Sequence, residues 1–304
     1  MRNGSPSGTH RCPESFHPIS LSLTQTGFPS TRPASVKTYP AVTPTSPINR
    51  CRCTIVVPFY NEAHRLRAEP FFDFLALVDP LHRAVRFLFV NDGSTDNTLA
   101  LLQEMQRGHE DRISILDQQP NGGKAEAIRN GMLTAIANNP GDCEYTGFWD
   151  ADLATPLSAI TQLLAQLEAA PHLHMIFGSR VRLLGRNIHR KPARHYLGRI
   201  FATVASKTLS LPIYDTQCGA KIFKVTPDLT HVLAQPFLSR WIFDVEIVAR
   251  YLRRCGREFC FSSMYEFPLD AWEDVGGSKL RPFDFFYAAF DIFRIHRRYL
   301  SSRP

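Results

Sequence analysis

What the sequence lacks excludes several classes of protein. It contains no run of about 18 uncharged apolar residues, the length that a membrane-spanning helix needs. It also lacks the basic, apolar and small-residue succession of a secretory signal. Its 7 Cys form no CxxC pair, which argues against a disulfide-stapled secreted protein and favours a reducing compartment. We therefore expect a cytoplasmic chain without a membrane span.

The composition is otherwise that of a globular chain, since 44% of the 304 residues are hydrophobic and 21% are charged. The formal net charge of +7 indicates an anionic partner or surface. No signature of a nucleic-acid-binding module accompanies this charge, so we expect no nucleic acid among the partners. Residues 1–50 contain 8 Pro, 8 Ser and 7 Thr without apolar periodicity, and are predicted to form a disordered basic tail.

From Cys51 onward, short apolar runs alternate with helical patterns. This alternation predicts an α/β domain with a mainly parallel sheet flanked by helices. Thr155 and Pro156 are predicted to open one of the helices, as N-cap and first helical residue. The predicted strands are 54–58, 87–90, 113–116, 147–150 and 175–178, and the other predicted helices are 96–107, 123–137 and 241–254.

Polar clusters follow three of the predicted strands, at residues 59–62, 91–94 and 150–152. In open α/β sheets, ligands bind beyond the carboxyl ends of the strands. Asp150 and Asp152 are separated by one residue, and two such carboxylates can hold a divalent cation such as Mg²⁺ together with substrate phosphates. A turn followed by a helix cap is the alternative for this acidic pair.

Seven motifs occur in order along the chain, and together they resemble the family 2 glycosyltransferases of GT-A fold. The last three resemble the branch of that family that contains dolichyl- and polyprenyl-phosphate glucosyltransferases and mannose synthases. The resemblance covers about residues 51–300, and it implies a GT-A nucleotide-diphospho-sugar transferase domain over 51–280. The motifs lie at 54–62, 90–96, 121–124, 150–152, 215–223, 240–246 and 277–279.

The resemblance implies a binding site for a nucleotide-sugar donor. Pro58, Tyr60, Glu62 and Asp92 would surround the nucleoside, because carboxylates accept hydrogen bonds from ribose hydroxyls and base N–H groups. Lys124 follows two glycines and precedes a helix, a place that favours the anionic nucleotide.

The same resemblance implies roles around the reacting bond. Asp150 and Asp152, a DXD motif, would hold Mg²⁺ or Mn²⁺ on the diphosphate, where the cation offsets the charge of the leaving group. Gln217 would bind sugar hydroxyls, Lys221 a phosphate, and Lys279 the diphosphate from a late loop.

A strongly basic stretch, residues 179–214, contains no acid. Arg180, Arg190 and Arg194 within it are candidates for binding an acceptor phosphate. An anionic membrane surface and a plain solvated face are the alternatives. The basic residues of the stretch are Arg180, Arg182, Arg186, Arg190, Lys191, Arg194, Arg199 and Lys207.

Asp244 and Glu246 lie on the predicted helix 241–254, about 200° apart around its axis, so only one of them can face the site. We favour Asp244 as the catalytic carboxylate. With a hydroxyl acceptor it would be the general base. A phosphate acceptor has a second pKa of about 6 and is already ionised, so Asp244 would then orient groups without taking a proton.

The segment 281–304 is predicted to form an amphipathic helix with an aromatic face and a basic end. Such a helix can lie in a bilayer interface, pack on the catalytic domain, or meet an anchoring subunit. The aromatic residues are Phe283, Phe286, Tyr287, Phe290 and Phe293.

The resemblance therefore implies an inverting, metal-dependent transferase, which we expect to be peripheral on the cytoplasmic face of a membrane. It would move a hexose from UDP-glucose or GDP-mannose to a polyprenyl or dolichyl phosphate. Two alternatives stay open: a family 2 transferase with a glycan or other hydroxyl acceptor, and a non-catalytic module that binds nucleotide sugars.

Overall fold

The computed structural model describes residues 51–138, 141–189, 192–275 and 284–301. The predicted disordered tail, 1–50, lies outside the described residues, as do Arg190 and Lys279. The side chain of Arg194 is likewise outside the description.

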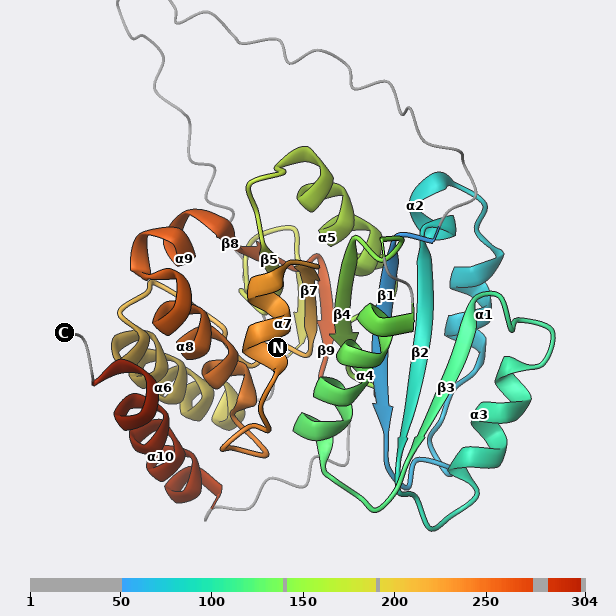
Figure 1. The fold of residues 1–304 in the computed structure, drawn as a ribbon, viewed down its shortest axis with the longest axis horizontal. Helices are drawn as coiled ribbons and strands as arrows, with labels where there is room; N and C mark the ends of the chain where they lie inside the picture. The colour runs from blue at the N-terminus through green and yellow to red at the C-terminus, as the bar shows by residue number, and fades with distance from the viewer. Residues whose placement is uncertain (1–50, 139–140, 190–191, 276–283, 302–304) are drawn as a thin grey trace, which may run out of the picture. The chain divides into compact units, whose positions relative to one another are not determined.

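A seven-stranded sheet forms the centre of the described part, in the order β3-β2-β1-β4-β7-β5-β8 (Figure 1). All neighbouring strands are parallel except β7, which runs antiparallel to both β4 and β5. The prediction of a mainly parallel sheet is thus confirmed. The strands are β1 (Cys53–Phe59), β2 (Val85–Asp92), β3 (Ile113–Gln118), β4 (Tyr145–Trp149), β5 (Met175–Ser179), β7 (Ala220–Lys224) and β8 (Met264–Pro268). Two short parallel strands, β6 (Asn187–His189) and β9 (Ala271–Glu273), form a second sheet.

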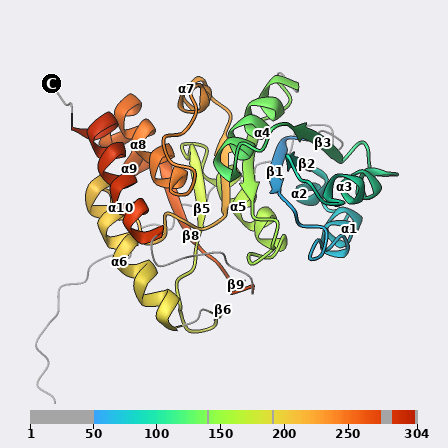
Figure 2. The same ribbon diagram turned by 90° about the horizontal axis from the view of Figure 1, so that it is seen from below.

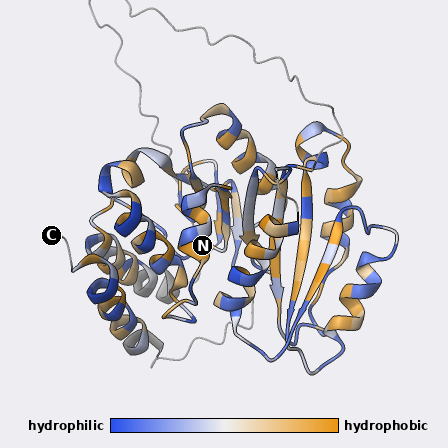
Figure 3. Ribbon diagram, viewed as in Figure 1, coloured by the Kyte–Doolittle hydropathy of each residue, from blue (hydrophilic) through white to orange (hydrophobic). Residues whose placement is uncertain are grey.

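Helices cover both faces of the large sheet, and a separate hydrophobic core lies under each face. Val56 packs in the core that contains α4, α7 and α8, whereas its neighbours Ile55 and Val57 pack in the core that contains α1, α3 and α5. The alternation follows from the strand period of two. Because both faces are covered, the central strands are largely apolar, as the mainly orange β2 shows in Figure 3. The edge strand β3 is more polar, with Ser114, Asp117 and Gln118 among its six residues.

The helices are α1 (Glu69–Ala76), α2 (Pro80–Arg83), α3 (Thr98–Gln106), α4 (Lys124–Asn138), α5 (Ser158–Ala169), α6 (Pro192–Leu209), α7 (Pro227–Leu233), α8 (Phe243–Cys255), α9 (Arg257–Ser263) and α10 (Asp284–Ile295), which continues as the π-helical turn η1 (His296–Leu300). The predicted helices at 96–107, 123–137 and 241–254 agree with α3, α4 and α8 within two residues at each end.

The predicted cap of the helix after the acidic pair is wrong, although the helix begins within two residues of the expected place. Helix α5 begins at Ser158, and its N-cap is Leu157 rather than Thr155. The carbonyl of Thr155 accepts a hydrogen bond from the Trp149 indole at 2.8 Å, and the first helix-like backbone hydrogen bonds are accepted by the carbonyls of Pro156 and Leu157.

Helix α10 packs beside α6 and α8, beyond the β8 edge of the sheet (Figure 2). Ala288, Ile292 and Ile295 are buried against the core, while Tyr287, Phe290 and Phe293 are exposed. One face of α10 therefore packs on the catalytic domain, and the opposite face carries the exposed aromatic rings. None of the helices in the described ranges combines the length and the hydropathy needed to cross a membrane.

Candidate active site

The carboxyl ends of β1, β2 and β4 bring the first three polar clusters to one edge of the sheet. Asp92, the last residue of β2, is buried and accepts hydrogen bonds from the turn that precedes α4. Its carboxylate accepts the N–H groups of Gly122 and Gly123, both at 2.8 Å, and the side-chain amides of Asn121 and Gln118. Asp92 therefore orients the turn at the start of α4.

This turn places Lys124 beside the acidic pair. The Lys124 ammonium lies 2.6 Å from a carboxylate oxygen of Asp150, which directly follows β4. The Lys124 side chain is 46% exposed, and its partial desolvation opposes the charge of the ammonium, but Asp150, Asp244 and Asp152 outweigh this effect and raise its pKa. Lys124 is thus a fixed positive charge at the edge where the acidic pair lies.

Asp150, the first member of the acidic pair, is held close to the backbone of Gly219, the residue before β7. A Cβ atom at Gly219 would lie 2.1 Å from the Asp150 carboxylate, so this approach requires glycine. Burial and the neighbouring Asp150 carboxylate raise the pKa of Asp152. An oxygen of Asp152 also accepts the N–H of Ala154 at 3.0 Å. Asp152 therefore also stabilises a turn, as the alternative interpretation of the acidic pair predicts.

Two carboxylates that disfavour each other's charge are a suitable donor set for a divalent cation. Within the described ranges, no third His, Cys, Asp or Glu joins them to make a protein-only metal site. A cation bound here would therefore take its remaining ligands from water or from substrate phosphates, as Mg²⁺ commonly does.

The side chain of Lys221 lies in the interior of the protein. Its ammonium is buried, lies 2.6 Å from Asp244, and donates to the carbonyl oxygen of Cys218. Contact between Lys221 and a phosphate stays a prediction, and it would require the ammonium to be shared with Asp244. Burial raises the pKa of Asp244 even though Lys221 acts in the opposite direction.

Asp244 and Glu246 point to different partners, as their helical spacing predicts. Asp244 lies within electrostatic reach of Lys124 and Asp150, whereas Glu246 binds Arg250 on the opposite side of α8. Asp244 is therefore the one that belongs to the candidate site.

Arg180 is paired with an acid from outside the basic stretch. It forms a two-pronged ion pair with Asp215 at 2.6 and 2.7 Å. Glu266 in turn accepts the N–H groups of Tyr214 and Asp215, which fixes this turn. A small cavity, about 30 Å³ in volume, lies here and is lined in part by Arg180, Arg199 and Gln217.

In the polar cluster at residues 59–62, which follows β1, one of the predicted nucleoside-binding side chains already has a partner within the protein. Pro58 lies within β1 opposite Val90, and the Tyr60 ring is exposed just beyond the strand. The carboxylate of Glu62 is bound by both guanidinium nitrogens of Arg65. Glu62 can therefore contact a nucleoside only if it shares its carboxylate with Arg65.

One candidate residue was not singled out from the sequence. Arg240 begins the 240–246 motif, and its guanidinium lies 2.9–3.3 Å from the point where a Cβ atom of Gly123 would be. Its neighbours among the residues described include no ion-pair partner. The sequence signal was its place in the motif, but the proximity to Gly123, more than a hundred residues away, could not be seen.

A covered, mainly parallel sheet with an acidic pair and a lysine at its carboxyl edge is the arrangement expected of a transferase of GT-A fold. The chain belongs to glycosyl transferase family 2, whose model matches residues 54–230. It is therefore a glycosyltransferase.

Among curated proteins, the chain is 30% identical over 266 residues to a dolichyl-phosphate beta-glucosyltransferase of Drosophila melanogaster, which covers 81% of this chain and 75% of that protein. It is 28% identical over 254 residues to a dolichyl-phosphate beta-glucosyltransferase of Trichomonas vaginalis, with 80% of this chain and 70% of that protein covered.

Solved structures confirm the fold. The mannosyl-3-phosphoglycerate synthase from Rubrobacter xylanophilus superposes with a TM-score of 0.56 at 14% identity, covering 83% of this chain and 74% of that chain. A mannosyltransferase from Pyrobaculum calidifontis, solved with GDP-Man and Mn²⁺, gives 0.54 at 19% identity, covering 84% and 66%.

Proposed function

We propose that this glycosyltransferase moves a hexose from a nucleotide sugar to a polyprenyl or dolichyl phosphate, with inversion and with a divalent cation. The observation that carries the proposal is the ion pair between Lys124 and Asp150, beside Asp152, at the carboxyl edge of the sheet. The fixed positive charge and the paired carboxylates lie together where such sheets bind ligands.

UDP-glucose is the donor we favour, because two curated relatives, each aligned with about four fifths of this chain, carry the name dolichyl-phosphate beta-glucosyltransferase. GDP-mannose is the alternative. Pro58, Tyr60, Glu62 and the turn held by Asp92 would surround the nucleoside. Gln217 would contact sugar hydroxyls.

In the proposed reaction, an oxygen of the acceptor phosphate attacks the anomeric carbon of the hexose. The bond from that carbon to the diphosphate breaks, and the nucleoside diphosphate leaves with the electron pair. Asp150 and Asp152 would hold Mg²⁺ or Mn²⁺, which offsets the negative charge of the departing diphosphate. Lys124 adds a positive charge from the protein, and Arg240 is placed to add a second.

No general base is required with this acceptor, because a phosphate monoester has a second pKa of about 6 and is largely dianionic at neutral pH. Asp244 fits the role of an orienting residue, since its carboxylate is already paired with Lys221. For the acceptor phosphate we propose Arg180, with Arg190 and Arg194 from the same basic stretch. Arg180 is held in one orientation by Asp215.

A lipid-linked acceptor requires access to a membrane surface. The exposed aromatic face of α10, with the exposed Arg297 and Arg298 following it, fits peripheral attachment to an anionic bilayer. We propose the cytoplasmic face as its place. An anchoring subunit would be an alternative way to reach the same surface.

The test is transfer of labelled sugar into organic-extractable lipid. Purified protein would be incubated with polyprenyl phosphate and Mn²⁺ or Mg²⁺, and UDP-glucose would be compared with GDP-mannose. Asp152→Ala should lower transfer by at least about a hundredfold, the scale of losing one electrostatic stabiliser of a transition state. The exposed Asp111, in the turn before β3, provides the matched control Asp111→Ala, which should transfer normally.

Labelled lipid from one donor, lost in Asp152→Ala and after chelation, would support the proposal. Donor hydrolysis that needs Asp152, without lipid product, would move the acceptor to a glycan or another hydroxyl compound. Donor binding without any turnover would favour the non-catalytic alternative and overturn the proposal.

A further inference from the structure

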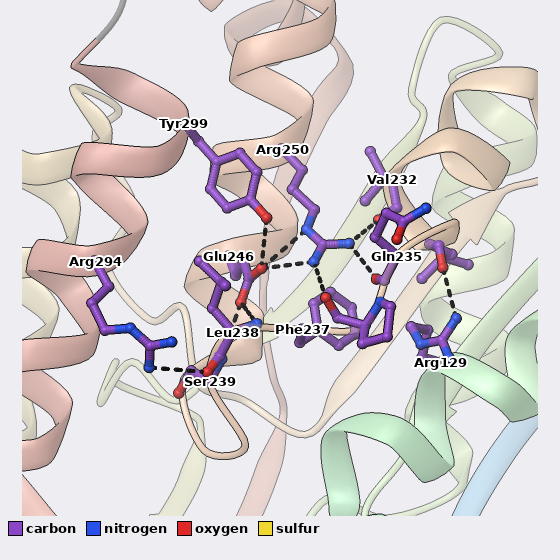
Figure 4. A network of polar contacts seen from close by, with 12 residues as sticks. Arg129, Val232, Gln235, Phe237, Leu238, Ser239, Glu246, Arg250, Arg294 and Tyr299 are labelled. Carbon is purple, nitrogen blue, oxygen red and sulfur yellow. Dashed lines mark hydrogen bonds and ion pairs between the residues drawn. The ribbon is translucent and has the colours of Figure 1, made fainter.

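A buried ion pair on α8 holds the loop that leads to Arg240. The guanidinium of Arg250 lies 2.7 Å from an oxygen of Glu246, one helical turn earlier (Figure 4). Arg250 also donates to three backbone carbonyls, those of Val232, Gln235 and Pro236, at 2.6–2.7 Å. It therefore fixes the end of α7 and the first half of the loop between α7 and α8.

Glu246 fixes the second half of the same loop. One of its oxygens accepts the backbone N–H groups of Leu238 and Ser239, at 2.8 and 3.2 Å. The other accepts the hydroxyl of Tyr299 at 3.0 Å, from the turn η1 near the end of the described chain. Burial and the nearby Glu246 carboxylate raise the pKa of Tyr299, so its hydroxyl stays protonated and donates.

The loop is also bound from the side of α4, the helix that begins with Lys124. Glu126 accepts the N–H of Phe237 at 3.1 Å, and Arg129 donates to the carbonyl of Leu233 at 3.1 Å. After Ser239 the chain turns into α8, with the Ser239 hydroxyl accepting the N–H of Ile242. Arg240 thus lies between Ser239 and Trp241, whose backbone N–H groups are both hydrogen-bonded, to Glu246 and to the Ser239 hydroxyl.

The side chain of Arg240 extends from this loop to Gly123, whose backbone has φ of +86°. Gly123 has no Cβ atom, so the guanidinium can approach the start of α4 next to Lys124. An exposed arginine has many side-chain conformations, and binding a diphosphate would require one of them. Anchoring the backbone on both sides of Arg240 reduces that cost.

We propose that Glu246, Arg250 and Tyr299, here named the Tyr299 clamp, are positioning residues that place Arg240 against the diphosphate of the donor. This inference rests on the proposed function, because it takes a nucleoside diphosphate as the ligand. It also means that a turn beyond residues 54–230, the part matched by the family model, completes the donor site.

Tyr299→Phe tests the clamp with the smallest change. It removes one oxygen and leaves the ring in place beside Arg250, so the fold should be retained, whereas removing Glu246 or Arg250 would leave a buried charge unpaired. Affinities for UDP and GDP would be measured by calorimetry with Mn²⁺. The variants are Tyr299→Phe, Arg240→Ala, the double variant and Tyr265→Phe, a control that removes an exposed hydroxyl from β8.

Tyr299→Phe should weaken binding of the nucleoside diphosphate about fivefold, and Arg240→Ala about tenfold or more. The double variant should bind no more weakly than Arg240→Ala, within about twofold, because Tyr299 acts through Arg240. A merely structural loss would weaken binding in both backgrounds. Tyr265→Phe should bind as the unaltered chain does.

Normal affinity in Tyr299→Phe, or additive losses in the double variant, would overturn the clamp and leave the proposed function standing. If the unaltered chain bound neither UDP nor GDP, both the clamp and the proposed function would fall. The first measurement, on the unaltered chain, therefore separates the two failures.

Discussion

The ammonium of Lys221 lies 2.6 Å from a carboxylate oxygen of Asp244, and both side chains are buried. Lys221 comes from β7, the antiparallel strand of the sheet, and Asp244 from the first turn of α8. The pair therefore joins the sheet to a helix beside the acidic pair of the candidate site. Its burial makes it sensitive to the loss of either partner, because an unpaired charge in the interior is costly.

Lys221→Met should lower the free energy of unfolding by about 3 kcal/mol or more, since it leaves the Asp244 carboxylate buried without its cation. Urea unfolding at neutral pH measures this. Lys224→Met is the matched control on the same strand: its ammonium bonds the carbonyl of Pro171 at the surface, so it should cost less than about 1 kcal/mol. Equal losses in the two variants would contradict the importance of the buried pair.

Asp244→Asn should slow transfer without changing the part of the pH–rate profile that would report a general base. The rate is expected to rise with pH around a pKa of about 6, which belongs to the acceptor phosphate. Because the acceptor and not the protein carries this ionisation, the same rise should persist in Asp244→Asn. Initial rates from pH 5 to 8 would show it, and its disappearance would identify Asp244 as a base.

Strand positions and the acidic pair were predictable from the sequence, because both depend on local patterns. Apolar runs bounded by turn residues identified β1 and β2. Asp150 and Asp152 were recognisable because they are separated by one residue and directly follow an apolar strand. The cap of α5 was mispredicted by two residues, because the Thr-Pro pattern is a local signal and does not show that the carbonyl of Thr155 binds the Trp149 indole.

The partners of charged residues were not predictable, because they come from distant parts of the chain. Arg180 lies in a stretch of sequence without acids, yet Asp215 binds it from 35 residues away. Lys221 lies in the motif at residues 215–223, but the motif alone does not show that the Lys221 side chain is buried. Arg240 approaches Gly123 only because the sheet and α8 are folded together.

Gly123→Ala should weaken binding of a nucleoside diphosphate about tenfold. The added methyl group would displace the guanidinium of Arg240, whose positive charge is proposed to contact the diphosphate. The backbone of Gly123 also has a positive φ, so alanine is strained there. Gly108→Ala separates the two effects. Gly108 has φ of +76° and nothing within 4 Å of an added Cβ atom.

Both glycine variants should therefore lose similar stability, about 1–2 kcal/mol, in thermal or urea unfolding. Only Gly123→Ala should lose affinity for UDP or GDP in calorimetry. Unchanged affinity in both variants would contradict the proposal that Arg240 contacts the donor.

The double variant Phe290→Ser, Phe293→Ser should reduce co-sedimentation with vesicles of phosphatidylglycerol and phosphatidylcholine. Both rings are exposed on one side of α10, and burying a phenylalanine side chain contributes about 1.5–3 kcal/mol. The loss should be tenfold or more in partitioning, by the relation of about 1.4 kcal/mol to each factor of ten. Phe261→Ser, on the exposed side of α9, is the matched control and should sediment normally. Equal sedimentation of all three proteins would contradict the proposal that α10 contacts the membrane surface.

The last prediction concerns Glu266, which holds the turn that presents Asp215 to Arg180. Burial raises the pKa of Glu266 above its ordinary value of 4.5. The folded chain therefore keeps the proton to a higher pH than the unfolded chain does. The contribution of this group to stability is fully present below the unfolded-state pKa and is lost as the pH rises through the folded-state pKa.

Urea unfolding between pH 4 and 7 would compare the unaltered chain with Glu266→Gln, whose amide does not ionise. The free energy of unfolding of the unaltered chain, minus that of Glu266→Gln, should fall as the pH rises, by at most about 1.4 kcal/mol per pH unit. The exposed Glu258 on α9 gives the control Glu258→Gln, for which the same difference should stay flat. A difference that grows with pH would mean that the hydrogen bonds from Tyr214 and Asp215 outweigh burial and lower the pKa of Glu266.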